Sequence, residues 1–444
     1  MSLRKFGLPW LLAVGVFLAA FPARADLKSY VASPDASYGY KILETEEVDG
    51  LSVTTIRLTS QTWQGIVWEH WLTILRPAVV EHPQGALLLI AGGNNGRPAP
   101  KLNGEDERTL GLIARGTKSV VAQLNQVPNQ PLFDGRHEDE IIALTYDKYL
   151  KGEGEDWPLL LPMVKSAVRA MDTVQAVVKE QHGQEITDFM VTGASKRGWT
   201  TWLSAAADSR VKAIAPIVID VLNMGAQAVN QLKSYGTYSD EVEDYTDLKI
   251  QERLASAKGE ELLSVVDPFA YRAQLTLPKL IVNGANDPYW CVDSSNLYFP
   301  ELAGPKYLYY QANTGHDVNI GGVATITQFY YNMLTGGVMP EVAWEVASDG
   351  AVSVNWTGAD GKATLWAAHS ENRDFRESTW EGKALEGNGA VSTAAPDPGD
   401  GYVAYYIEVK FPGAVQLPYG ITTQMTVLPN TFPHEAPVRA AKAN

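Results

Sequence analysis

One serine in the sequence has the neighbours of a catalytic nucleophile. Ser195 lies in Val-Thr-Gly-Ala-Ser-Lys-Arg-Gly, residues 191–198, between a short apolar run and a helix-like segment. A serine on a tight strand-to-helix turn presents its hydroxyl for attack, and the usual pattern for that turn is Gly-x-Ser-x-Gly. Here the second glycine comes one position late, so the same residues also fit an ordinary serine that caps a helix. The local residues leave both interpretations open.

An aspartate and a histidine follow Ser195 in the order that a catalytic triad needs. A serine hydroxyl is a poor nucleophile unless a histidine takes its proton and a carboxylate orients that histidine. Asp287 comes after the apolar run 277–283, and His316 comes after the next run, 307–311. Serine, acid, histidine is the chain order of α/β-hydrolases. We therefore predict Ser195 as the nucleophile, His316 as the proton shuttle and Asp287 as the residue that orients it.

Other acids and histidines fit this arrangement less well. The rivals for the acid are Asp220, Asp293 and Asp317. His137 lies in His-Glu-Asp-Glu, residues 137–140, where a metal site is the alternative interpretation. A single histidine among acids, without a second ligand at metal spacing, is instead typical of a solvated loop. We predict no metal and no cofactor.

The tetrahedral intermediate of acyl transfer needs hydrogen-bond donors for its oxyanion. The N–H of Lys196, the residue after the nucleophile, is predicted as the first donor. The second is predicted from Gly93 or Asn94, in the glycine-rich segment that follows the apolar run 86–90. That segment also fits a plain tight turn. It does not fit a phosphate loop, since no Gly-Lys-Ser/Thr follows it.

Aromatic side chains gather near the predicted triad. Tyr289 and Trp290 lie in the loop that carries Asp287, so we predict that they wall the substrate pocket. Trp199 and Trp202 follow the nucleophile at helical spacing and are predicted to pack in the core.

The elements that must position these residues alternate between strands and helices. From residue 86 to residue 334, short apolar runs typical of strands buried on both faces alternate with helical segments. This pattern predicts a mostly parallel sheet with helices on both faces, preceded by antiparallel strands within residues 40–77. Residues 125–157 are predicted as a polar surface excursion, and residues 221–273 as an insertion with helical character.

The pattern changes near Met339, where short alternating runs separated by Asp-Gly turns predict a β-sandwich. We therefore divide the chain into a signal peptide (1–25), an α/β-hydrolase-like domain (26–338), a β-sandwich domain (339–430) and a flexible tail (431–444). The sandwich is expected to contribute no residue to the triad.

The first 25 residues predict export. Arg4 and Lys5 precede the apolar stretch 8–21, and Ala23-Arg24-Ala25 is a small-x-small cleavage site. An uncleaved anchor helix is the alternative, but the stretch is short for a membrane span. Cleavage after Ala25 removes three basic residues and no acidic one, which changes the formal net charge from −15 to −18.

The composition of the chain argues against several classes of partner and site. An acidic chain repels phosphate backbones and anionic lipid, so we expect no nucleic-acid partner and no stable membrane insertion after cleavage. The single cysteine, Cys291, excludes an intramolecular disulfide and a cysteine-based zinc site. We predict a periplasmic or secreted protein that acts on a small-molecule or peptide substrate.

Several segments together resemble a known family. Gly-Ala-Ser-Lys-Arg-Gly-Trp-Thr-Thr-Trp (193–202), Trp-Pro (157–158), Leu-Pro-Met-Val-Lys (161–165) and Ala-Met-Asp (170–172) resemble the PhoPQ-activated pathogenicity-related family. The resemblance implies an exported α/β-hydrolase-like domain followed by a β-sandwich, and an association with bacterial envelope stress and virulence.

The nucleophile segment is also similar to that of glucuronoyl esterases, which have Gly-Cys-Ser-Arg-x-Gly. Ala194 replaces the cysteine, and Lys196 replaces an arginine whose side chain assists the oxyanion. This resemblance implies that Lys196 contributes a cation as well as its N–H. The resemblance does not imply the same specificity for sugar acids, because a lysine lacks the planar guanidinium group of an arginine.

These observations predict an exported serine hydrolase that works through an acyl-enzyme on a peptide or ester substrate of the bacterial envelope or its surroundings. Ester and peptide bonds share this mechanism, so the choice between peptidase and esterase stays open. The alternative is a non-catalytic envelope-binding or virulence-associated protein on a hydrolase scaffold.

Overall fold

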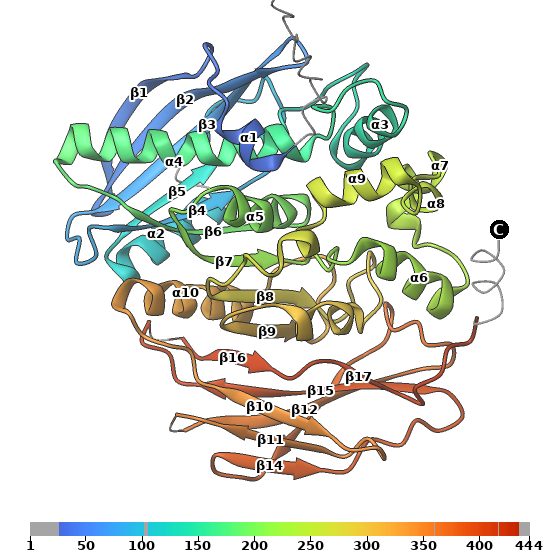
Figure 1. Ribbon diagram of the computed structural model, residues 1–444. Helices are drawn as coiled ribbons and strands as arrows, with labels where there is room; N and C mark the ends of the chain where they lie inside the picture. The colour runs from blue at the N-terminus through green and yellow to red at the C-terminus, as the bar shows by residue number, and fades with distance from the viewer. Residues whose placement is uncertain (1–25, 102–104, 359, 416, 435–444) are drawn as a thin grey trace, which may run out of the picture.

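The computed structural model describes residues 26–101, 105–358, 360–415 and 417–434 (Figure 1). The expected signal peptide and residues 435–444 of the expected tail lie outside the described residues. Within the described part of the chain, no helix is long and apolar enough to cross a membrane.

A large mixed sheet forms the centre of the molecule. Its strands run in the order β1-β2-β3-β5-β4-β6-β7-β8-β9 before they meet the C-terminal strands. The first three, β1 (Gly39–Val48), β2 (Leu51–Trp63) and β3 (Ile66–Pro77), are antiparallel, as the sequence predicts. The parallel part consists of β4 (Gly85–Ile90), β5 (Val120–Leu124), β6 (Asp188–Ala194), β7 (Val211–Ile217), β8 (Lys279–Gly284) and β9 (Lys306–Gln311).

Helices cover both faces of this sheet, as predicted. Successive residues of a strand point to opposite faces, and on β4 Leu88 belongs to one core while Leu87 belongs to the other. The first core includes α1 (Leu27–Ala32), α4 (Leu160–His182) and α5 (Lys196–Ala207), and the second includes α2 (Glu105–Thr117) and α10 (Ile320–Thr335). This is the α/β-hydrolase arrangement, with the helices in two layers (Figure 1).

The sequence predicts a polar surface segment over residues 125–157, and this prediction is wrong for the middle of the segment. Helix α3 (Glu138–Leu150) forms there, and Ile141, Ile142 and Tyr146 are fully buried. Their spacing places these apolar side chains on one side of a helix, so they pack into the core although the surrounding residues are polar.

The predicted insertion is present between β7 and β8. It contains α6 (Met224–Tyr235), η1 (Asp240–Val242), α7 (Glu243–Asp247), α8 (Ile250–Arg253), α9 (Ala257–Val266) and η2 (Pro268–Tyr271). Helices α6, α7 and α8 lie beyond the carboxyl ends of the parallel strands (Figure 1). They therefore lie at the edge of the sheet where α/β proteins place their functional sites.

The C-terminal strands form two sheets that face each other, which confirms the β-sandwich. One sheet contains β10 (Val342–Val346), β11 (Val352–Trp356) and β14 (Ala390–Thr393). The other contains β12 (Lys362–Ser370), β13 (Glu381–Leu385), β15 (Tyr402–Phe411), β16 (Tyr419–Thr422) and β17 (Thr426–Leu428).

The sandwich is joined to the central sheet. Thr422 of β16 pairs with Leu308 of β9, so the second sandwich sheet continues the large one. Phe329 of α10 shares a core with Ile407 of β15. The two parts of the chain therefore bury apolar surface against each other.

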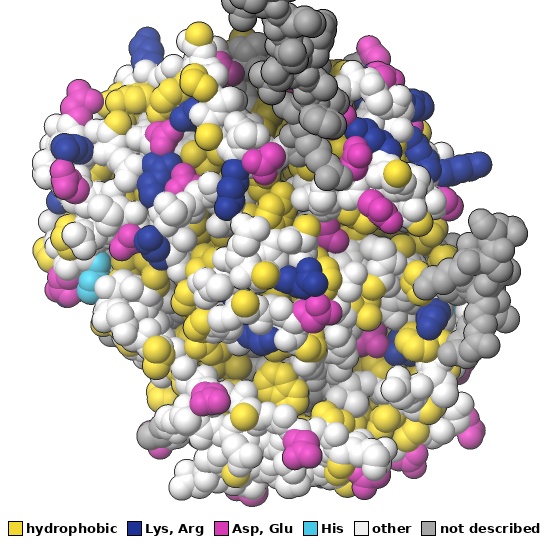
Figure 2. Space-filling view, in the orientation of Figure 1, with side chains coloured by type: hydrophobic (Ala, Val, Ile, Leu, Met, Phe, Trp, Pro, Cys, Tyr) yellow, Lys and Arg dark blue, Asp and Glu magenta, His cyan; other side chains and the backbone are white. Residues whose placement is uncertain are grey.

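Surface charges of both signs are interspersed on the face drawn in Figure 2. The net negative charge is therefore not gathered into one patch there.

Candidate active site

Ser195 occupies a strained turn between β6 and α5. Its backbone has φ 57° and ψ −130°, a conformation that few residues other than glycine adopt. Its N–H donates to the carbonyl of Ile217 on β7 at 2.9 Å. The side chain makes no capping hydrogen bond, so the hydroxyl is not used to cap α5. The geometry is that of a nucleophile elbow and not of a serine cap.

The late glycine of the motif allows α5 to pack close to the sheet. A Cβ on Gly198 would lie 2.7 Å from Cγ2 of Ile219, and one on Gly193 would lie 2.9 Å from Cβ of Arg197. Both positions therefore require glycine for close helix–strand packing. The glycine three residues after the serine therefore allows the same close packing as the glycine of the usual motif, which lies two residues after the serine.

His316 and Asp287 form a close pair at the ends of neighbouring parallel strands. His316 Nδ1 lies 2.8 Å from Oδ2 and 3.0 Å from Oδ1 of Asp287. Because a carboxylate only accepts, Nδ1 carries the proton in this pair and Nε2 of the neutral ring is left as an acceptor. His316 Nε2 is buried and has no hydrogen-bond partner among the described residues.

The rival acids are engaged elsewhere. Asp293 forms an ion pair with the buried Arg373 at 2.8 Å. Asp220 accepts hydrogen bonds from Tyr298 and Asn283. The Asp317 carboxylate accepts from the N–H of Val318 at 2.7 Å.

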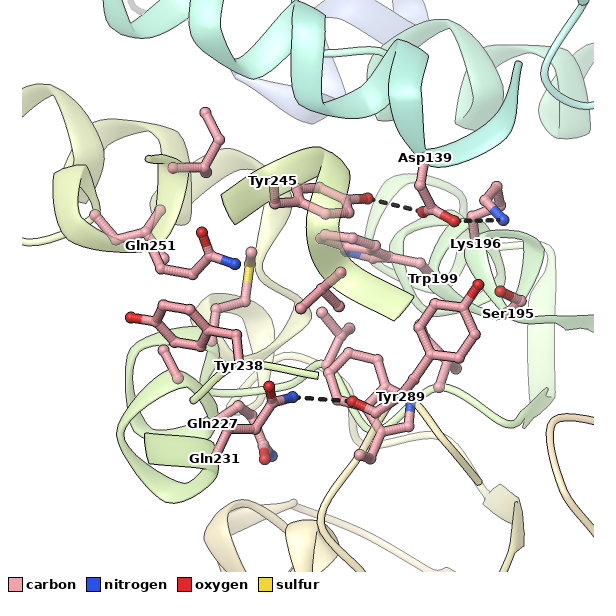
Figure 3. A pocket seen from close by; sticks show the side chains of 18 of the residues that line it. Asp139, Ser195, Lys196, Trp199, Gln227, Gln231, Tyr238, Tyr245, Gln251 and Tyr289 are labelled. Carbon is pink, nitrogen blue, oxygen red and sulfur yellow. Dashed lines mark hydrogen bonds and ion pairs between the residues drawn. The ribbon is translucent and has the colours of Figure 1, made fainter. Parts of the chain in front are cut away.

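Ser195 and His316 line one cavity of about 90 Å³, shown in Figure 3. The predicted pocket residues Tyr289 and Trp290 line it too. Trp199 also lines it, although its indole N–H donates to the Val266 carbonyl and its side chain is buried as predicted. Trp202 is fully buried in the core.

The glycine-rich segment after β4 lies beside Arg197. A Cβ on Gly92 would be 2.7 Å from the guanidinium of Arg197, and Gly93 has φ 127°. Asn94 accepts a hydrogen bond from the side chain of Gln130 at 3.2 Å. Neither Gly93 nor Asn94 is among the residues that line the cavity, so the second oxyanion donor stays a prediction.

The side chain of Lys196 is held by two carboxylates. Its Nζ lies 2.9 Å from Glu138 and 3.1 Å from Asp139, both in the first turn of α3. Burial alone would raise the pKa of Glu138, but the charges of Arg197 and Lys196 outweigh it and lower that pKa to about 2. The cation implied by the esterase resemblance is therefore already paired.

The interpretation of residues 137–140 as a solvated loop is wrong for these two acids, because Glu138 and Asp139 form the cluster with Lys196 and Arg197. The partners lie almost sixty positions apart in the chain, so no local pattern in the sequence reveals them. The part of the chain that the structure covers contains no group of three metal-ligating side chains able to hold a metal ion.

The loops that carry Asp287 and His316 are held by residues 372–380 of the sandwich, here called the strap. Asn286 Nδ2 donates to the carbonyls of Phe375, Arg376 and Ser378, at 2.7 Å for Ser378. In the histidine loop, the Asn313 side chain exchanges two hydrogen bonds of 2.8 and 2.9 Å with the backbone of Trp380.

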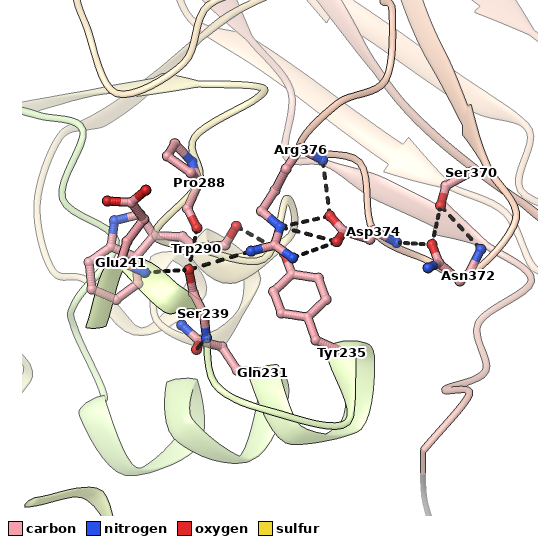
Figure 4. A network of polar contacts seen from close by, with 10 residues as sticks. All are labelled: Gln231, Tyr235, Ser239, Glu241, Pro288, Trp290, Ser370, Asn372, Asp374 and Arg376. Carbon is pink, nitrogen blue, oxygen red and sulfur yellow. Dashed lines mark hydrogen bonds and ion pairs between the residues drawn. The ribbon is translucent and has the colours of Figure 1, made fainter. Parts of the chain in front are cut away.

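The strap also reaches the insertion. Arg376 pairs with Asp374, lies over the ring of Tyr235 at 4.5 Å, and approaches Ser239, as Figure 4 shows. Nothing in the composition of the strap marks it as close to Asp287 and His316, so the sequence alone does not reveal this contact.

A second serine–histidine pair lies elsewhere in the fold. His70 Nε2 is 2.9 Å from Ser60 Oγ, but both side chains are buried, and Ser60 is fully inaccessible. Burial lowers the pKa of His70 to about 4, against hydrogen bonds that raise it. This pair is structural, because no substrate can reach its hydroxyl.

Several known proteins are similar to this chain. Autocrine proliferation repressor protein A of Dictyostelium discoideum is 30% identical, over 92% of this chain and 91% of that protein. Among solved structures, an acetyl xylan esterase from Paenibacillus sp. R4 has a TM-score of 0.47 at 14% identity, covering 68% of this chain and 91% of that one. A glucuronoyl esterase from Solibacter usitatus has a TM-score of 0.41 at 12% identity, covering 68% and 90%.

The model of one protein family, described as PhoPQ-activated pathogenicity-related protein, matches residues 27–376. This match includes the elbow, both loops of the Asp287–His316 pair and the first half of the strap. The chain belongs to the PhoPQ-activated pathogenicity-related protein family.

Proposed function

We propose that this protein is a serine hydrolase that works through an acyl-enzyme. The observation that carries the proposal is the pairing of His316 with Asp287 at the cavity that Ser195 also lines. In this reaction Ser195 Oγ attacks the carbonyl carbon of the substrate while His316 Nε2 takes its proton. Asp287 holds the imidazole in the required tautomer and stabilises its positive charge.

The elbow supplies a donor for the developing oxyanion. Lys196 is the first residue of α5, where N–H groups have no partner within the helix. Its N–H therefore serves as one donor, and Gly93 or Asn94 is proposed as the source of the second. The protonated His316 then gives its proton to the leaving group, and a water molecule, activated by the same histidine, releases the acyl group.

The proposed substrate is an ester or a peptide outside the cytoplasm. This part of the proposal rests on the signal-peptide pattern, and it predicts that the exported protein begins at Asp26. Sequencing the N-terminus of the protein recovered from the extracellular or periplasmic fraction tests it. An N-terminus at Met1 in that fraction would contradict it.

Labelling with a fluorophosphonate, which reacts with activated serines, tests the catalytic role of Ser195. We expect the wild-type protein to label and Ser195→Ala not to label. The exposed Ser209 provides a matched control, and Ser209→Ala should label like the wild type. A folded wild-type protein that does not label would contradict the proposal and favour a non-catalytic binding role on the same scaffold.

A further inference from the structure

The cavity beside Ser195 is built mainly by the insertion. Residues of α6, α7 and α8 form one side, and α5 with the segment after β7 forms the other. The apolar side chains that define its walls include Trp199, Ile219, Met224, Ala228, Ile250 and Leu254. A group bound there is therefore surrounded mostly by hydrocarbon and aromatic rings.

Two amide side chains of the lining, Gln227 and Gln231, are largely occupied by other parts of the chain. Gln231 Nε2 donates to the Tyr289 carbonyl at 2.9 Å, and its Oε1 accepts from Ser239. Gln227 Nε2 donates to the carbonyls of two other residues, at 3.1 Å each. These amides shape the wall and have few hydrogen-bonding positions left for a substrate.

The charged side chains of the lining are paired as well. Lys196 is bound by Glu138 and Asp139, and the Asp139 carboxylate also accepts from the hydroxyl of Tyr245 at 2.9 Å (Figure 3). A substrate carboxylate in the cavity would have to compete with two fixed carboxylates for the only cation of the described lining.

Apart from Ser195 and His316, two residues of the described lining have a buried polar atom without a hydrogen-bond partner. These atoms are Gln251 Oε1 and Trp290 Nε1. The acceptor and the donor can each form a hydrogen bond with one polar atom of a substrate. They cannot replace the water molecules that hydrate a sugar ring or a charged group.

The volume limits the size of the bound group. An apolar cavity of about 150 Å³ holds benzene, with six carbons. On the same scale, the cavity of about 90 Å³ holds a group of about four carbons. A longer chain would have to displace the walls or extend into solvent.

We propose that the insertion cavity is the acyl pocket, and that it selects substrates with a short, uncharged, apolar acyl group of about four carbons. This inference rests on the proposed function. The acyl group is assigned because it stays bonded to Ser195 in the acyl-enzyme and can remain in the cavity. The leaving group receives its proton from His316 and must depart before water attacks.

The first test compares p-nitrophenyl acetate, butyrate, octanoate and hemisuccinate by kcat/KM with the full chain. Each buried methylene is worth about 4-fold, so butyrate should exceed acetate by about 15-fold. Octanoate should fall below butyrate, and hemisuccinate, with a charge at the same length, should fall at least about 100-fold below it. A profile that rises steadily to octanoate, or equal rates for butyrate and hemisuccinate, would overturn the inference.

Two substitutions in the cavity wall should shift the preferred acyl chain length in opposite directions. Ala228→Phe fills the cavity and should lower the butyrate-to-acetate ratio by about 10-fold. Leu254→Ala enlarges it and should raise the octanoate-to-butyrate ratio by a similar factor. Ala226→Phe, on the same helix but not in the cavity lining, is the matched control and should keep the wild-type ratios.

The outcomes separate the two proposals. A protein that labels at Ser195 but shows no chain-length optimum, or whose ratios do not respond to Leu254→Ala, overturns the acyl-pocket inference alone. The same conclusion follows if selectivity resides in the alcohol part of an ester series with constant acyl group. A protein that neither labels nor hydrolyses any of the esters overturns the proposed function and the inference with it.

Discussion

The ring of Tyr289 lies against the imidazole of His316, with the two centroids 4.2 Å apart and 32° between the ring planes. The backbone N–H of the same tyrosine donates to Asp287 Oδ1 at 2.9 Å. Tyr289 therefore contacts both members of the histidine–aspartate pair. We therefore expect Tyr289 to position the imidazole of His316 as well as to line the cavity.

Removing the Tyr289 ring should impair turnover more than substrate binding. In Tyr289→Ala the imidazole loses the surface that fixes its plane, and a displacement of about 1 Å can cost on the order of 100-fold in rate. We expect kcat to fall by 10- to 100-fold on that basis, with a smaller change in KM. Tyr289→Phe keeps the ring and should keep most of kcat. Equal losses in both variants would show that the hydroxyl, and not the ring, is what matters.

The acid of the triad can be identified by isosteric substitution. Asp287→Asn keeps an acceptor for the Tyr289 N–H but turns the imidazole to the wrong tautomer, so turnover should fall on the order of 10⁴-fold. Asp220→Asn and Asp293→Asn should retain far more activity, because neither carboxylate contacts His316 in the structure. Steady-state rates of the three folded variants decide this. A 10⁴-fold loss in the Asp220 or the Asp293 variant, with Asp287→Asn still active, would show that this other aspartate is the acid of the triad.

The fold and the triad segments follow from local sequence patterns. Continuous apolar runs such as residues 86–90 mark strands buried on both faces, and the loops after such runs carry Ser195, Asp287 and His316. The carboxyl ends of parallel strands meet at one edge of a sheet, so residues far apart in the chain can be predicted to lie near one another.

Contacts between distant segments do not follow from such patterns. The pairing of Glu138 with Lys196 depends on how α3 packs against α5, and a run of acids looks the same whether it is solvated or paired. The strap contact at Asn286 depends on the docking of the sandwich. These contacts carry no periodicity, so only the folded structure reveals them.

The sandwich should influence catalysis through Asn286. In Asn286→Ala the loop that carries Asp287 loses an amide group whose two N–H donors are shared among three strap carbonyls, and each hydrogen bond is worth about 0.5–1.5 kcal/mol to stability. We expect kcat to fall about 10-fold or more, since Asp287 is the neighbouring residue. Fluorophosphonate labelling rates and kcat measure this effect.

Asn296→Ala is the matched control for that variant. Asn296 Nδ2 also donates to the C-terminal part of the chain, at the Met425 carbonyl, 2.8 Å away, but it lies in the short 3-10 helix Ser294–Leu297 that follows the segment around Asp287. Its loss should lower thermal stability while kcat stays near the wild-type value. If both variants lower kcat equally, the sandwich acts through overall stability and not through the acid loop.

The pH dependence of stability should reveal the buried carboxyl of Asp220. Burial raises its pKa to about 7, although hydrogen bonds from Tyr298 and Asn283 act in the opposite direction. In the unfolded chain the same group has a pKa of about 3.9. Between these values the folded protein holds a proton that the unfolded chain has released, so the free energy of unfolding falls as pH rises from about 4 to about 7.

Asp220→Asn should remove the decrease in the free energy of unfolding between about pH 4 and about pH 7. Oδ1 accepts both hydrogen bonds in the wild type, and the amide oxygen of asparagine can accept both as well. The variant should therefore match the wild type near pH 4 and exceed it above pH 7, by on the order of 4 kcal/mol for a shift of this size. Guanidinium unfolding at pH 4 to 8 measures the difference. Glu138→Gln serves as a contrast of opposite sign, because a pKa lowered to about 2 contributes stability that is lost only as pH falls below about 4.5. Parallel pH profiles for the wild type and Asp220→Asn would mean that Asp220 ionises in the folded protein as it does in water.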